Sequence, residues 1–329
     1  MTEKSISKTI QQFTTSVIEN TIDISEAERN INEIHAHFQQ LTGITGFDFS
    51  IENLAAVPTA KGKALGLNYA AQCLLDFKRT VKFLRAIVAA ILRCQKEQPG
   101  KTINIFYAGC GPYAPFVTLV APLFNPDEIQ FTLLEINKNS VDSAKKLIGA
   151  LNLTKHVKEV FIADAVTFKV PSPKAFHILI SETLDAMLFR ECYVPILFNL
   201  LPQFNENVIL IPENVIINLS FLPLTEGDAE LGLGSVLDVR ESIMENSNLD
   251  EIPTMLPEKV IDLKSHNLNQ YDRILLDTKV HVQGEIWLTR NESSLTIPLQ
   301  LTLEQPFTKK TIAFTYEMEP QIELKCRFE

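Results

Sequence analysis

The chain has 329 residues, 46% of them hydrophobic, which is enough to bury a large core and lies outside the composition of disordered proteins. With 30 basic and 40 acidic residues its formal net charge is -10, so we expect it to bind neither nucleic acid nor an anionic membrane surface, and to favour cationic ligands. Its five scattered cysteines, without a CxxC pair, indicate neither a disulfide framework nor a metal site and fit a reducing, cytoplasmic location. We expect no targeting segment and no membrane span, because no apolar run is long enough for one.

The first sixty residues are predicted to form an N-terminal helical segment, residues 1–60. The run "SEAE" is typical of a capping box, with Ser25 as the N-cap and Glu28 reaching back to it. From Leu74 to Cys94, apolar residues recur every three or four positions, which predicts a long amphipathic helix. We interpret the stretch before that helix, "AAVPTAKGKALG", as a connection.

Residues 102–211 alternate short apolar runs with helical patterns. Near-continuous hydrophobicity is typical of strands buried on both faces of a parallel sheet. The runs are "INIFYA", "FTLLEI", "EVFIA", "FHILIS" and "NVILIP". Between them, "KNSVDSAKKLIGAL" places its apolar residues on one helical face. The pattern predicts an α/β fold with a doubly wound, Rossmann-like domain over residues 61–212.

After Pro212 the pattern changes to an alternation of apolar and polar residues. It is found in "NVIINLSFLPL", "KVHVQGEIWL", "SLTIPLQLTLE", "TIAFTYEM" and "IELKCRF". This period of two predicts a C-terminal antiparallel β domain, barrel-like, over residues 213–329. We assign no element to the polar stretch "ESIMENSNLDEIPTMLPEKV".

Candidate ligand-binding residues follow the first three predicted parallel strands. In "YAGCGPYAP", Gly109 and Gly111 allow a tight turn and a close approach of backbone N–H groups to a ligand. Glu135 ends the second strand, where an acid can accept hydrogen bonds from ribose hydroxyls, and Asp164 ends the third, beside the place of an adenine ring. The alternative is a glycine turn that only packs strand against helix. Because no third glycine follows, the motif departs from the dinucleotide fingerprint and favours S-adenosylmethionine.

The stretch "SETLDAMLFRE" places three carboxylates directly after the fourth predicted strand. Combined with the glycine motif, it resembles class I S-adenosylmethionine-dependent methyltransferases, and among them the protein arginine methyltransferases. That family follows its fourth strand with "SE" and a second Glu nine residues on, which is the spacing of Glu182 and Glu191. "DFKRTVKF" resembles the family's helix before the glycine motif, whose Arg contacts the cofactor carboxylate and corresponds to Arg79. The resemblance runs from about Leu67 to Phe221.

The resemblance implies a methyltransferase with S-adenosylmethionine as its cofactor and an acceptor held by two glutamates. The implied cofactor-binding residues are Arg79, Gly109, Gly111, Glu135 and Asp164, and the implied catalytic residues are Glu182 and Glu191. A guanidinium offers five N–H donors in a planar fork, so two carboxylates on either side of it can orient one nitrogen toward a methyl group. The family usually dimerises through an arm between core and barrel, so a homodimer is one expectation, with the arm within residues 222–259.

Several readings stay open at this point. The acceptor is free arginine, a small guanidino metabolite, a peptide or a protein. A second hypothesis is an N- or O-methyltransferase on a non-guanidino acceptor, with one Glu as general base. A third is a non-catalytic scaffold, supported by Tyr107 and Tyr113, which replace the family's acid and third glycine. The family's "THW" loop, which helps close the substrate pocket, has no match, so cofactor binding is better supported than a protein substrate. The simplest alternative for "SETLDAMLFRE" is a solvated loop, and we interpret Asp185 as a turn residue in either case.

Overall fold

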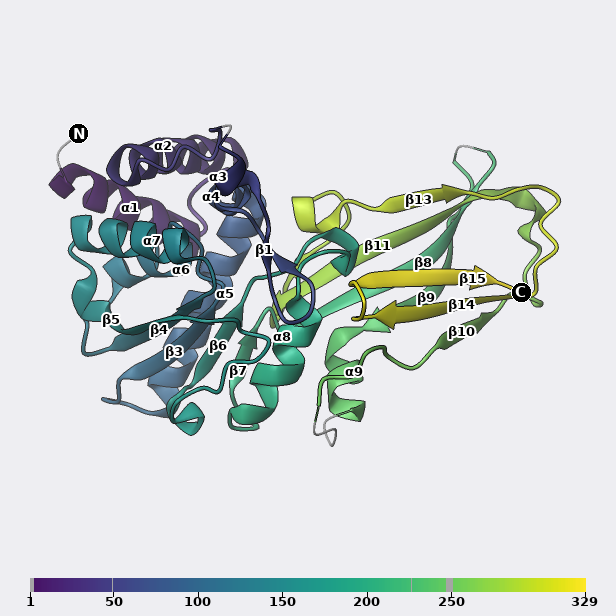
Figure 1. Cartoon of the computed structure of the whole chain (residues 1–329). Helices are drawn as coiled ribbons and strands as arrows, with labels where there is room; N and C mark the ends of the chain where they lie inside the picture. Colours follow the sequence, from purple (N-terminus) through teal and green to yellow (C-terminus); the bar gives the residue numbers. More distant parts are fainter. Residues whose placement is uncertain (1–2, 49, 226, 247–250) are drawn as a thin grey trace.

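The structure is a computed structural model that describes residues 3–48, 50–225, 227–246 and 251–329. Figure 1 shows a helical layer, a parallel sheet beneath it, and an elongated antiparallel β region, residues 214–328, that extends from one side of the sheet. Among the described residues, no helix is both long and apolar enough to cross a lipid bilayer.

The parallel sheet has five strands in the order β5-β4-β3-β6-β7. Their bounds are β3 (Ile103–Ala108), β4 (Ile129–Glu135), β5 (Val157–Ile162), β6 (Ile178–Ser181) and β7 (Ile209–Ile211). Ala108 pairs with Leu134 of β4 and with Ser181 of β6, so these three strands end at the same edge. β3, β4 and β6 are almost wholly buried, as their continuous apolar runs predict. The doubly wound α/β fold with N-terminal helices is confirmed.

Helices cover the sheet and form the N-terminal layer. The α-helices are α1 (Glu3–Ile18), α2 (Ile24–Thr42), α3 (Ile51–Leu54), α4 (Leu67–Gln72), α5 (Phe77–Glu97), α6 (Pro115–Thr118), α7 (Lys138–Ala150), α8 (Tyr193–Leu200) and α9 (Val239–Glu245). The predicted capping box at Ser25 is wrong. Helix α2 begins two residues earlier than expected, at Ile24, with Asp23 as its N-cap, and the Asp23 carboxylate accepts the Glu26 N–H at 2.8 Å.

Short 3-10 helices connect the main elements. They are η1 (Cys73–Leu75), η2 (Ala121–Leu123), η3 (Thr154–His156), η4 (Pro173–Ala175), η5 (Ala186–Leu188), η6 (Leu201–Gln203), η7 (Leu268–Gln270) and η8 (Ser294–Thr296). A two-stranded hairpin, β1 (Val57–Pro58) and β2 (Lys63–Ala64), lies within the stretch that we interpreted as a plain connection. In Figure 1 it descends from the helical layer over the junction between the parallel sheet and the β region.

The β region consists of two antiparallel sheets that do not close into a barrel. The prediction of antiparallel strands is therefore confirmed, and the prediction that they form a barrel-like domain is wrong. Closure depends on which strands pair at the sheet edges, and alternating polarity carries no information on that. One sheet has the order β12-β11-β8-β9 with β13 also paired to β11, and the other has the order β10-β14-β15. The bounds are β8 (Asn214–Pro223), β9 (Leu231–Asp238), β10 (Lys259–Asp262), β11 (Tyr271–Gln283), β12 (Ile286–Leu288), β13 (Leu299–Thr302), β14 (Thr311–Glu317) and β15 (Glu323–Phe328).

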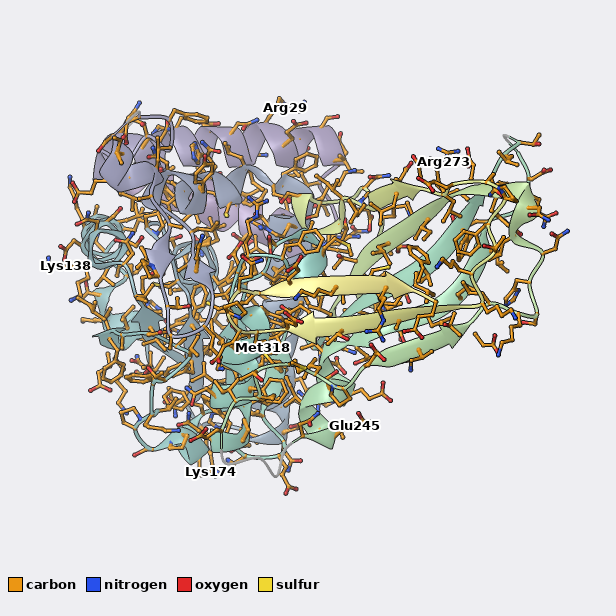
Figure 2. All side chains as sticks on the ribbon, turned by 45° about the vertical axis from the view of Figure 1, so that its right-hand side comes forward. Arg29, Lys138, Lys174, Glu245, Arg273 and Met318 are labelled. Carbon is orange, nitrogen blue, oxygen red and sulfur yellow. The ribbon has the colours of Figure 1, made fainter. Side chains whose placement is uncertain are left out.

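The segment expected to contain a dimerisation arm, residues 222–259, supplies β9, α9 and the start of β10 in its described part, and α9 contacts β8 and β9. The two sheets meet the parallel sheet at their inner ends. Met318, just after β14, is almost fully buried there, whereas Arg273 of β11 lies on the outlying part of the β region (Figure 2). One continuous hydrophobic core joins both regions.

Candidate active site

Six of the seven predicted site residues line one pocket at the carboxyl ends of the parallel strands. They are Gly109, Gly111, Glu135, Asp164, Glu182 and Glu191. The pocket encloses about 790 Å³, part of it open to solvent. It lies where the strand order reverses between β3 and β6, the place where open α/β sheets bind their ligands. The seventh residue, Arg79 of α5, is not part of the lining and contacts the pocket through Glu182.

The turn after β3 contains two glycines, Gly109 and Gly111, that differ in the space available for a side chain. Both lie in the left-handed region, with φ of 71° at Gly109 and 63° at Gly111, where other residues are strained. A Cβ on Gly109 would lie 2.3 Å from Cγ2 of Thr183, so packing also excludes a side chain there. A Cβ on Gly111 has no neighbour closer than that of Ala70 at 4.0 Å. Gly111 therefore leaves space for a ligand next to its Cα. The expectation that these backbone N–H groups face a ligand is not met, because the Gly109 N–H donates to the Leu134 carbonyl at 2.8 Å and the Gly111 N–H donates to Glu135.

Glu135, the last residue of β4, is linked to this turn. Its Oε2 accepts the Gly111 N–H at 2.9 Å, and its Oε1 accepts the Asn137 N–H at 2.9 Å. Burial raises the pKa of Glu135, and these hydrogen bonds oppose the rise. An ionised carboxylate has about four lone-pair sites, so acceptor capacity remains for a further donor such as a ribose hydroxyl.

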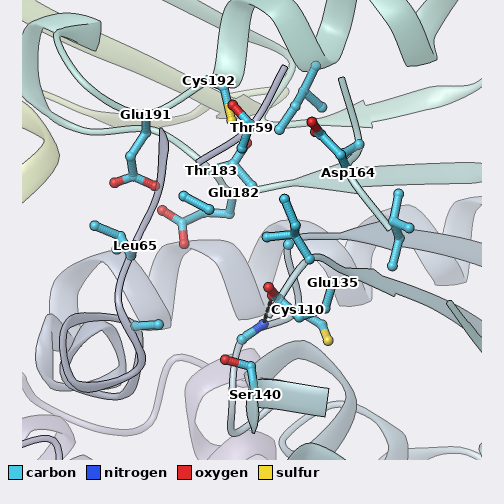
Figure 3. Close-up of a pocket in the computed structure, with 18 of the residues that line it drawn as sticks. Thr59, Leu65, Cys110, Glu135, Ser140, Asp164, Glu182, Thr183, Glu191 and Cys192 are labelled. Atoms are coloured by element: carbon cyan, nitrogen blue, oxygen red, sulfur yellow. Dashed lines mark hydrogen bonds between the residues drawn. The ribbon is translucent and has the colours of Figure 1, made fainter. Parts of the chain in front are cut away.

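Asp164 follows β5 at the opposite side of the pocket from the glycine turn (Figure 3). Its Oδ1 accepts the Val166 N–H at 2.9 Å, which orders the turn that follows the strand. Its Oδ2 accepts the N–H of Ala60, in the hairpin of β1 and β2, at 2.6 Å. The residue predicted to lie beside an adenine ring is thus tied to a segment 104 residues away in the chain.

Glu182, directly after β6, forms a buried ion pair with Arg79. Their side chains are 12% and 7% exposed, and Glu182 Oε1 lies 3.2 Å from Nη1 of Arg79 without hydrogen-bond geometry at that oxygen. Burial raises the pKa of Glu182 to about 7, although Arg79 opposes the rise. The Arg79 guanidinium also donates to the Cys73 carbonyl at 2.5 Å, which fixes its position. Breaking such a pair leaves a buried charge, at a cost of about 3–5 kcal/mol.

Glu191 lies at the same end of the pocket, and Figure 3 shows its carboxylate turned toward that of Glu182. Burial raises its pKa to about 8, and the neighbouring Glu182 and Asp185 add to the rise. Among the described residues, no salt bridge within 4.0 Å involves Glu191. The two carboxyl groups therefore share a largely desolvated site, and when both are ionised their two negative charges face only one cation, Arg79.

The loop between these two glutamates is held in a strained conformation by the β region. Met187 and Leu188 have φ of 64° and 55°, which costs a non-glycine residue roughly 1–3 kcal/mol each. The Met187 N–H donates to Oγ1 of Thr278 on β11 at 2.9 Å, and the Tyr316 hydroxyl of β14 donates to the Leu188 carbonyl at 2.9 Å. Asp185 accepts the Glu191 N–H at 3.4 Å, so its interpretation as a turn residue is confirmed.

The chain was compared with known protein families, sequences and structures. No protein-family model matches the chain, and a search of curated protein sequences finds no significant match. Among solved structures, the chain is similar to arginine methyltransferases. A chain of the Trypanosoma brucei PRMT1 enzyme–prozyme heterotetrameric complex with AdoHcy aligns over 78% of this chain and 92% of its own, with 12% identity and a TM-score of 0.48. Protein arginine methyltransferase 10 of Arabidopsis thaliana, in an open conformation, aligns over 80% of this chain and 97% of its own, with 11% identity and a TM-score of 0.48.

Tyr113, which stands in place of a third glycine, has a structural role. Its hydroxyl donates to the Ile44 carbonyl at 2.7 Å, and its ring packs edge-on against His35 and Phe38 of α2. This side chain therefore fastens the N-terminal helices to the glycine turn. Tyr107, in contrast, lines the pocket.

Sequence reasoning missed several lining residues. Thr59, Lys63 and Leu65 come from the hairpin of β1 and β2 and the residue after it. Cys73 is the first residue of η1, and Cys192 directly precedes α8. The run "KGK" is the local pattern that could have indicated the hairpin, because its Gly62 adopts a φ of 86° in the turn.

Proposed function

We propose that the chain is an S-adenosylmethionine-dependent methyltransferase whose acceptor is a guanidinium or a similar cationic nitrogen. One observation carries this proposal. Glu182 and Glu191 lie together, half-buried, with pKa values raised to about 7 and about 8 mainly by desolvation, in the pocket that the glycine turn and Glu135 also line. Buried like charges are costly unless a cation compensates them, and clustered perturbed pKa values are typical of functional sites.

The lining residues fit the proposed cofactor. Gly111 leaves space beside its Cα for a ligand, and the Glu135 carboxylate, held by the backbone N–H groups of Gly111 and Asn137, faces the pocket where ribose hydroxyls would lie. Arg79 lies outside the lining, next to Glu182, and adds a positive charge near the place proposed for the carboxylate of an amino-acid group. When bound, S-adenosylmethionine would supply a methyl group on a positively charged sulfur.

The two glutamates would bind and orient the acceptor. A guanidinium between them gains charge-assisted hydrogen bonds from both sides, which fixes one nitrogen in place and replaces the protons that the carboxyl groups hold in its absence. Alignment of two reactants can lower a barrier by roughly 7–11 kcal/mol in the best cases. One carboxylate can then take up the proton that the acceptor nitrogen loses.

A second candidate function is methylation of a non-guanidino N–H or hydroxyl group, with Glu191 as the general base. It is favoured by the asymmetry of the pair, because Glu182 is bound to Arg79 whereas Glu191 forms no salt bridge among the described residues. A pKa of about 8 would suit a general base near neutral pH.

The test is a binding and transfer experiment on the wild-type chain. Calorimetry should show S-adenosylmethionine and S-adenosylhomocysteine binding at one site per chain. Transfer of a labelled methyl group to free arginine, to agmatine and to an arginine-containing peptide should give at least one methylated product by mass spectrometry. No cofactor binding at millimolar concentration would leave the scaffold hypothesis as the better one. Binding without any guanidino product, but with methylation of amines or hydroxyls, would favour the second candidate.

A further inference from the structure

The hairpin of β1 and β2, residues 57–64, contacts the pocket near Asp164 and near Glu191, and it also contacts the β region. Its turn is closed by a hydrogen bond from the Thr59 N–H to the Gly62 carbonyl at 3.2 Å, and Thr59 Oγ1 donates to the Lys61 carbonyl at 2.7 Å. Thr59, Lys63 and Ala64 line the pocket. The hairpin is therefore an ordered part of the pocket wall.

On the inner side, the hairpin is bound to the pocket at two places. The Ala60 N–H donates to Oδ2 of Asp164, on the side predicted for the cofactor. Lys63 pairs with Glu191 in an isolated parallel β-bridge, on the side predicted for the acceptor. Figure 3 shows the hairpin backbone passing close to Glu191 and, on its other strand, carrying Thr59. The backbone edge of Glu191 is therefore already occupied by the chain itself.

On the outer side, the hairpin is attached to the turn between β14 and β15. Lys61 forms an ion pair with Glu319 there. Gly62 packs so closely on Ile322 that a Cβ on the glycine would lie 3.2 Å from its Cγ1. The hairpin is thus in contact with Glu191 on one side and with the turn between β14 and β15 on the other.

We propose that this hairpin restricts the acceptor to a small guanidino molecule that enters the pocket whole, and that it excludes an arginine within a protein chain. This inference rests on the proposed function and specifies its substrate class. An arginine in a peptide brings backbone on both sides of it, which must lie along the rim next to Glu191. That rim is occupied by Lys63 and closed by the attachment to the β region, and displacing ordered protein contacts lowers affinity.

The first experiment compares free arginine with the peptide Gly-Gly-Arg-Gly-Gly on the complex with S-adenosylhomocysteine. Calorimetry gives both dissociation constants, and single-turnover methyl transfer on the complex with S-adenosylmethionine gives both rates. Free arginine should bind at least about tenfold more tightly and react correspondingly better. A peptide that binds as tightly as free arginine, or more tightly, would overturn the inference and leave the proposed function standing. If neither compound binds, the proposed function fails and the inference fails with it.

The second experiment releases the hairpin without changing a residue that lines the pocket. In the double variant Lys61→Ala/Ile322→Ala, both contacts with the β region are removed. The preference for free arginine over the peptide should fall at least about tenfold, through better peptide binding. The matched control is Arg327→Ala, which breaks a 3.2 Å surface ion pair with Glu258 elsewhere in the same sheet and should leave the preference unchanged. An unchanged preference in the double variant would overturn the role of the hairpin.

Discussion

Binding of a guanidinium to Glu182 and Glu191 should release protons, because the empty pair retains them at neutral pH. With pKa values of about 7 and about 8, the pair holds roughly 1.4 protons at pH 7, about 0.5 and about 0.9 on the two groups, and roughly 0.1 at pH 9. A cation between the carboxylates lowers both pKa values, so the bound state holds almost none. The raised pKa values therefore weaken binding progressively as the pH falls below about 8.

The size of the effect follows from the same two values. Protonation of each carboxyl group multiplies the dissociation constant by 1 + 10^(pKa − pH). The product for the two groups is about 2 × 11 at pH 7 and about 1.01 × 1.1 at pH 9, so the dissociation constant should be roughly 20-fold larger at pH 7. The assay is calorimetry of ethylguanidine on the complex with S-adenosylhomocysteine, in buffers of different ionisation enthalpy, at pH 7 and pH 9. Ethylguanidine keeps its charge over this range, as an arginine side chain does. An affinity that changes less than about threefold, without proton release at pH 7, would refute the reasoning.

Four further predictions concern single residues. Glu191→Gln should raise the melting temperature of the ligand-free protein by at least about 2 °C at pH 9 and leave it unchanged at pH 4. The reason is that a carboxyl group with a raised pKa in the folded state lowers stability only as the pH rises above its pKa in the unfolded state. An equal loss of stability at both pH values would contradict this. Gly111→Val should abolish binding of S-adenosylhomocysteine in calorimetry, whereas Gly100→Val, another left-handed glycine with open space around it, should not. Glu135→Ala should weaken that binding by about 1.5–3 kcal/mol, and normal affinity in a folded variant would exclude its role. Thr278→Val should lower kcat with little change in cofactor affinity, because it releases the strained loop, and Thr278→Ser should restore kcat; equal losses in both variants would point to a packing effect instead.

The parts of the fold that could be predicted from the sequence are those whose cause is local. The strands β3, β4 and β6 follow from continuous apolar runs, since each is buried on both faces. The run that became β5 was also expected to be buried, and this is wrong, because β5 is an edge strand whose residues are half-buried or exposed. The glycine turn, Glu135, Asp164 and Glu182 fall at one edge because parallel strands end together there, so their meeting in one pocket was predictable from strand order. Their chemical roles stay predictions.

What the sequence could not predict depends on contacts between distant segments. The hairpin at 57–64 has two-residue strands without a recognisable pattern, and it is fixed by Asp164 and Glu319, which lie 104 and 258 residues from their partners. The strained turn at Met187 is fixed by Thr278, 91 residues away. The N-cap of α2 was misjudged for a different reason, because Asp23 and Ser25 are both good caps and only the geometry decides between them.

The measurement that tests the central claim most directly is single-turnover methyl transfer to free arginine by the wild type, Glu182→Gln, Glu191→Gln and the double variant. Melting curves confirm folding of each variant, because Glu182 pairs with the buried Arg79. If both carboxylates clamp one cationic nitrogen, each single variant should lose at least about 100-fold in rate, and the double variant should be scarcely slower than either, since residues that act as a unit are not additive. Affinity for S-adenosylhomocysteine should stay within about threefold in all four proteins. Full activity in folded Glu191→Gln would contradict the account, because "SETLDAMLFRE" would then be a loop without a role in the acceptor site.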